Sequence, residues 1–81
     1  MPEISVRFFA AAREAFGTRE SRLQAGSVDD LVAILTEGAD PQAATVLSRS
    51  SFLINSVAAT DYAEALSDGD TVDVLPPFAG G

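Results

Sequence analysis

Alternating polar and apolar residues predict a β-strand near each end of the chain. Residues 3–8 and residues 71–75 both repeat with a period of two, as expected for strands with one buried face. The side chains predicted to face inward are Ile4, Val6, Phe8, Val72 and Val74. Phe9 and Leu75 follow on the outer face of these strands, where exposed apolar side chains can form part of an interface.

A change to helical periodicity predicts the main helix. Ser27 is a favourable N-cap, and the two aspartates in the first turn suit the positive end of the helix dipole. Apolar residues then recur at i, i+3, i+4 and i+7, which gives one stripe for packing on a sheet. These residues are Val28, Leu31, Val32 and Leu35. Gly38 ends the helix, and Asp40 with Pro41 predicts the start of a shorter one.

Shorter patterns complete the predicted secondary structure. Residues 10–16 indicate a short helical turn that ends at Gly17, and residues 18–24 a polar strand suited to a sheet edge. Apolar runs at residues 52–54 and 57–59 predict two further strands joined by a tight turn. The main order is then two strands, the helix, the short helix and three strands.

This order predicts an α+β fold. Pairing the first strand with the last in parallel closes the sheet most simply, with the main helix across one face. The result is a roll of the ubiquitin type, with a mixed sheet of four to five strands and one main helix. We expect a single domain over residues 1–81, from which residues 76–81 project as a C-terminal tail.

The residue types that are missing restrict the chemistry. The 81-residue chain has no Cys, no His and no Lys, and its five cationic side chains are all Arg. Thiolate and Schiff-base catalysis are therefore excluded, and so are the usual neutral base and the commonest metal ligands. We expect no metal site, no cofactor bound by this chain and no enzyme activity of the chain alone.

Charge and hydropathy restrict the partners and the location. The net charge of −7 disfavours nucleic acid and anionic membranes as partners, and it favours either simple solubility or a basic protein partner. No apolar run approaches the length of a membrane span, and no basic start precedes a hydrophobic stretch. These features predict a cytoplasmic protein.

The C-terminal residues suggest a reactive tail. Pro76 and Pro77 end strand pairing and stiffen the exit from the sheet, and Phe78 is an apolar side chain beyond them. After Ala79 come Gly80 and Gly81, a thread without side chains that ends in a carboxylate. Such a tail suits entry into a narrow active site of another protein, although chain ends are also often frayed and without function.

Three stretches resemble the small subunits of molybdopterin synthase (MoaD), a family of ubiquitin-like sulfur carriers. They are Phe8-Phe9-Ala10-Ala11-Ala12-Arg13-Glu14, Leu66-Ser67-Asp68-Gly69-Asp70-Thr71-Val72 and Leu75-Pro76-Pro77-Phe78-Ala79-Gly80-Gly81. The resemblance implies a β-grasp fold and a reaction cycle on the carboxylate of Gly81. An ATP-using adenylyltransferase related to ubiquitin-activating enzymes would adenylate it, and a sulfurtransferase would supply the sulfur of a thiocarboxylate.

The resemblance also implies how the sulfur is delivered. The tail would enter the large subunit of a heterotetrameric synthase and donate sulfur to cyclic pyranopterin monophosphate, which forms molybdopterin. By position, Phe9, Leu75 and Phe78 would contact the large subunit, while Pro76 and Pro77 would direct the tail. Small residues stand at positions 58 and 59, where a larger apolar contact is expected in this family.

Other functions use the same kind of tail. A sulfur carrier can serve thiamine, cysteine or tRNA thiolation, and a ubiquitin-like modifier forms an amide bond to lysine through its terminal glycine. A non-covalent adaptor would not need the tail. The paired prolines, Pro76 and Pro77, favour the molybdopterin pathway among these alternatives.

Overall fold

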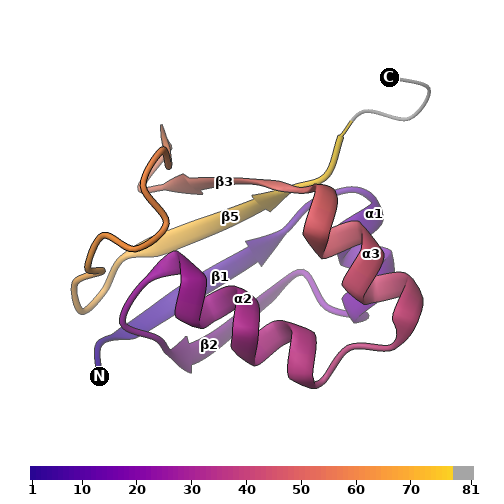
Figure 1. Cartoon of the computed structure of the whole chain (residues 1–81), viewed down its shortest axis with the longest axis horizontal. Helices are drawn as coiled ribbons and strands as arrows, with labels where there is room; N and C mark the ends of the chain where they lie inside the picture. The colour runs from indigo at the N-terminus through magenta and orange to yellow at the C-terminus, as the bar shows by residue number, and fades with distance from the viewer. Residues whose placement is uncertain (78–81) are drawn as a thin grey trace.

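The computed structural model describes residues 1–77, and the predictions for Phe78, Ala79, Gly80 and Gly81 lie outside the described residues. It contains one sheet with the helices on one side (Figure 1). The elements in chain order are β1 (Glu3–Phe8), α1 (Ala11–Phe16), β2 (Glu20–Gln24), α2 (Val28–Glu37), α3 (Pro41–Arg49), β3 (Ser51–Ile54), β4 (Val57–Ala58) and β5 (Thr71–Leu75).

The sheet joins the two ends of the chain at its centre. Its strand order is β2-β1-β5-β3-β4, with β1 and β5 parallel and every other pair antiparallel. Val6 lies beside Val72 and Phe8 beside Val74 in the parallel register. The expected α+β, β-grasp arrangement with a mixed sheet is therefore confirmed, and the sheet has five strands in the described part of the chain.

One face of the sheet carries the hydrophobic core. The five side chains predicted to face inward from β1 and β5 are all buried there. From α2, Val28 and Leu31 are fully buried and Val32 and Leu35 partly so, which confirms the predicted stripe. The further core residues are Ala12, Ala25, Leu47, Phe52 and Leu66. The ring of Tyr62 packs edge-on against Phe52, so the loop before β5 also closes over the core.

The helix boundaries follow from local hydrogen bonds. The Ser27 hydroxyl accepts the N–H of Asp30 at 3.1 Å at the start of α2, and an Asp40 carboxylate oxygen accepts the N–H of Ala43 at 2.8 Å at the start of α3. Gly17 ends α1 with a φ of 70°, the left-handed conformation that glycine adopts most easily. No helix within residues 1–77 is long and apolar enough to cross a membrane.

The predicted helical turn that ends at Gly17 is confirmed as the helix α1, between β1 and β2. The structure differs from the expected elements in two places. β2 begins at Glu20 rather than at residue 18, because the Thr18 hydroxyl donates to the carbonyl of Glu20 and makes a local turn. β4 has only two residues, Val57 and Ala58.

Replacing Ser27 with alanine is expected to lower the free energy of unfolding by about 1 kcal/mol, because the N–H of Asp30 loses its acceptor. Ser27→Asn keeps an acceptor at the N-cap and should remain close to the wild type. Urea denaturation followed by circular dichroism measures both variants. Equal losses in the two would show that the cap is not the source of the effect.

Candidate partner-docking site

Phe9 is held at the end of β1 by its own backbone. Its N–H donates to the carbonyl of Val74 in β5 at 3.3 Å, and its carbonyl accepts the N–H of Ala12 in α1 at 3.0 Å. Ala10 then turns the chain into α1 with a φ of 49°, a strained value for a residue with a side chain. This sharp turn fixes Phe9 at the surface, where its side chain is half-buried.

The residues that lead into the tail lie next to Phe9. Leu75 pairs with Ser51 of β3 and is half-buried, and strand pairing ends there. Pro76 and Pro77 follow without regular structure, the second of them exposed (Figure 1). An open groove of about 600 Å³ runs along this region. Its lining residues are Phe9, Ala10, Ala11, Arg49, Ser51, Leu75, Pro76 and Pro77.

Four of the predicted site residues are thus brought together. We call Phe9, Leu75, Pro76 and Pro77 the docking surface. They come from opposite ends of the sequence, and the parallel pairing of β1 with β5 makes them neighbours. Their contact with a partner stays a prediction. The other predicted site residues, Phe78, Ala79, Gly80 and Gly81, lie outside the described residues.

An ion pair that we did not predict lies beside the docking surface. Arg7 donates from Nε and from a terminal nitrogen to the two carboxylate oxygens of Asp73, at 2.7 and 2.9 Å. The Asp73 side chain is only 6% exposed, whereas that of Arg7 is 46% exposed. Hydrogen bonding and charge attraction from Asp73, with a smaller attraction from Glu20, raise the pKa of Arg7 above its ordinary value.

The guanidinium also contacts the docking surface. The central carbon of the Arg7 guanidinium lies 5.7 Å from the centre of the Phe9 ring, within the range of a cation–π interaction. The sequence contained a sign of this arrangement. Arg7 and Asp73 occupy outward positions on two strands that were predicted to pair, so opposite charges could have been matched across them.

Arginine side chains gather around Phe9 although the chain as a whole is acidic. Arg7, Arg13 and Arg19 line a second hollow that also includes Phe9 and Glu20. Arg49 lines the groove of the docking surface. Four of the five arginines therefore lie in these two hollows, so the charge near the docking surface differs from the net charge of −7.

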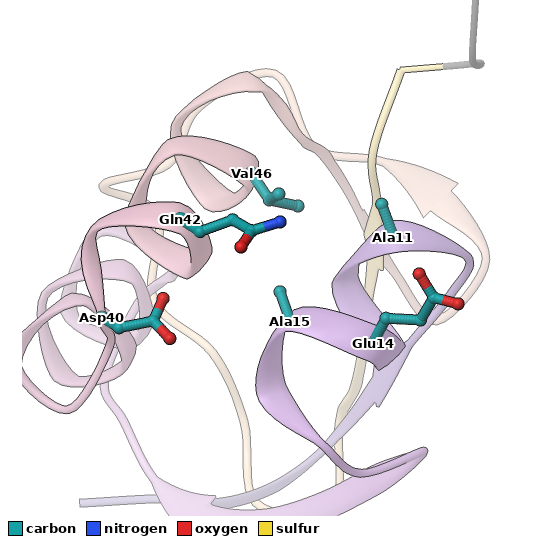
Figure 2. Close-up of a pocket in the computed structure, with 6 residues that line it drawn as sticks. All are labelled: Ala11, Glu14, Ala15, Asp40, Gln42 and Val46. Atoms are coloured by element: carbon teal, nitrogen blue, oxygen red, sulfur yellow. The ribbon is translucent and has the colours of Figure 1, made fainter.

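A smaller hollow between α1 and α3 does not suggest a ligand site. Figure 2 shows Glu14 and Ala15 from α1 opposite Gln42 of α3 and Asp40, the N-cap residue of that helix. Its volume is about 170 Å³, and the Asp40 carboxylate already caps α3. Within residues 1–77, no cluster of three or more His, Cys, Asp or Glu side chains is arranged to hold a metal ion.

The family model that matches this sequence is that of the ThiS family, over residues 6–81. The chain belongs to the ThiS family. Among curated proteins, the molybdopterin synthase sulfur carrier subunit of Chlamydomonas reinhardtii is 36% identical over 84 residues. That match covers 98% of this chain and 99% of the algal protein, which confirms the resemblance to the small subunits of molybdopterin synthase.

Solved structures show the same fold for this ThiS-family chain. A chain of the protein-protein complex of subunits 1 and 2 of molybdopterin-converting factor from Helicobacter pylori matches with a TM-score of 0.75 and 26% identity, over 98% of this chain and 99% of that one. The small archaeal modifier protein 1 of Methanosarcina acetivorans matches with a TM-score of 0.84 and 28% identity, over 100% of this chain and 98% of that one. The ThiS-family match also spans Phe78, Ala79, Gly80 and Gly81.

Arg7→Met is expected to lower the free energy of unfolding, because it leaves the Asp73 carboxylate buried without its partner. A second substitution, Asp73→Leu, added to Arg7→Met should recover much of the loss, because an apolar side chain needs no counter-charge there. Chemical denaturation of the wild type and the two variants measures the effect. A double variant as unstable as Arg7→Met alone would contradict this account of the pair.

Proposed function

We propose that this chain is the sulfur-carrier subunit of a molybdopterin synthase and that its reactive group is the carboxylate of Gly81. The observation that carries the proposal is the 36% identity to a molybdopterin synthase sulfur carrier subunit over nearly the whole of both chains. The family match that runs to Gly81 and the docking surface where the tail begins support it.

The chemistry that we propose takes place on the tail and uses partner enzymes. A carboxylate is a poor electrophile, so an adenylyltransferase first joins it to the α-phosphate of ATP and releases pyrophosphate. Sulfur at the sulfide level, supplied by a sulfurtransferase, then attacks the carbonyl carbon of Gly81. The new carbon–sulfur bond forms as the bond to AMP breaks, which leaves a thiocarboxylate. Because Gly80 and Gly81 have no side chains, the tail could enter a narrow site.

The docking surface would give the carrier its affinity for the large subunit. Phe9 and Leu75 provide half-buried apolar area next to the groove, and contact with a partner would remove that area from water. Pro76 and Pro77 restrict the backbone between Leu75 and the glycines, which reduces the entropy lost when the tail is inserted. In the complex, a heterotetramer of two carriers and two large subunits, sulfur would pass to cyclic pyranopterin monophosphate.

A protein modifier is the second candidate function. The structural match to a small archaeal modifier protein, with a TM-score of 0.84, favours it. A modifier would form an amide bond between Gly81 and a lysine of another protein. Higher-mass conjugates that disappear when Gly81 is deleted would support modification. A mass gain equal to the exchange of one oxygen for one sulfur, without conjugates, would support sulfur carriage.

Deleting Gly81 is expected to abolish sulfur transfer and to leave the stability of the fold unchanged. The five strands described all lie within residues 3–75, so the deletion leaves their sequences intact. Transfer is measured as molybdopterin formed by the reconstituted synthase, and stability by thermal denaturation. The matched control is Ser27→Ala, which should lower stability and leave transfer intact. Full transfer by the shortened chain would contradict the proposal.

Phe9→Ala and Leu75→Ala are each expected to weaken binding to the large subunit by about 1–3 kcal/mol, because each removes apolar area from the docking surface. The same loss is expected for Phe78→Ala. Isothermal titration calorimetry measures the affinity. Val57→Ala is the control, since Val57 is 68% exposed on the edge strand β4 and does not line the groove. Unchanged affinity in all three site variants would contradict the assignment of the surface.

A further inference from the structure

Asp73 has an unusual position for a buried charge. It lies on the face of the sheet opposite the core, between Arg7 of β1 and Leu53 of β3, yet only 4% of the residue is exposed. No other charged or polar residue in the described part of the chain is buried. Burying a carboxylate is costly unless it is paired and hydrogen-bonded, so the Arg7 side chain must be held close to it.

Arg7 therefore has two contacts that restrict its guanidinium. Both Asp73 oxygens accept hydrogen bonds from it, and such a bidentate pair fixes the orientation of the planar group as well as its position. The guanidinium carbon lies over the ring of Phe9 at 5.7 Å. Asp73 is anchored in the central strand β5, so the chain of contacts runs from the middle of the sheet to Phe9.

Phe9 needs such a contact more than a core residue does. It follows the last residue of β1 and is only half-buried, so packing by itself leaves its side chain less restricted than that of Phe8. A side chain that is already ordered loses less entropy on binding than a free one. Holding the ring in place before the partner arrives would thus raise affinity without adding a contact.

We propose that Arg7 is a positioning residue for partner docking, which holds the Phe9 ring in its binding orientation through the bidentate pair with Asp73. This inference rests on the proposed function, in which Phe9 contacts the large subunit. Lysine cannot replace arginine in this role, because its single ammonium group lacks the planar fork that binds both carboxylate oxygens.

The test is a double-mutant cycle on binding to the large subunit. Arg7→Lys retains the positive charge beside Asp73, so the fold should persist. The second substitution in the cycle is Phe9→Leu, which retains an apolar side chain but removes the ring. In the wild-type background, we expect Arg7→Lys to weaken binding about two- to fivefold, the range for an exposed cation–π contact. In the Phe9→Leu background, we expect the same substitution to have little effect on binding. Arg22→Lys, on the edge strand β2 away from both hollows, is the matched control and should leave affinity unchanged.

The outcomes separate this inference from the proposed function. If the wild-type chain does not bind the large subunit, the proposed function and this inference both fail. If it binds and Arg7→Lys weakens binding equally in the two backgrounds, Arg7 acts only through overall structure and the inference alone is overturned. A second measurement needs no partner: the ring-current shift of the Arg7 side-chain protons in the free wild-type chain should disappear in Phe9→Leu. Absence of that shift in the wild type would also overturn the inference.

Discussion

The parallel pairing of β1 with β5 is the constraint on which the rest of the structure depends. It joins segments near the two ends of the chain, since Arg7 and Asp73 are separated by 66 positions, and closing so long a loop costs entropy. Burial of Val6, Phe8, Val72 and Val74 on the inner face offsets that cost. The helices and the remaining strands lie between these two strands in the sequence, and α2 covers the shared apolar face (Figure 1).

The same register places the hydrophobic core on one face of the sheet and the ion pair and docking surface on the other. Inward residues form the core, while the outward positions place Arg7 beside Asp73 and, further along the two strands, Phe9 near Leu75. A shift of one residue in either strand would exchange its faces and bring the charged side chain into the core. The ion pair and the core therefore favour the same register, and that register assembles the docking surface from two distant segments.

Much of the fold could be predicted because the sequence carries local signals for it. The alternation in β1 and β5 and the cap at Ser27 depend only on neighbouring residues, and both predictions are confirmed. The outward position of Phe9 and Leu75 followed from the alternation of faces, and their contact with a partner is implied by the family resemblance and stays a prediction. The Arg7–Asp73 pair could have been matched across the two predicted strands, but the register of the strands and the orientation of Arg7 over Phe9 are not fixed by the alternation within either strand. The strained turn at Ala10 was missed for a similar reason: alanine gives no sign of a positive φ.

The division between surface and tail bears on how such a carrier would choose its partners. Gly80 and Gly81 have no side chains, so they cannot distinguish one receiving enzyme from another except by their backbone. Discrimination must then come from other groups of the carrier, and in this chain the apolar docking surface and the arginines beside it lie where the tail begins. Charge near an interface affects encounter and partner choice more than final affinity. In this chain, the arginines would therefore select among partners while Phe9 and Leu75 supply the affinity, and the glycines would remain free to fit any narrow active site.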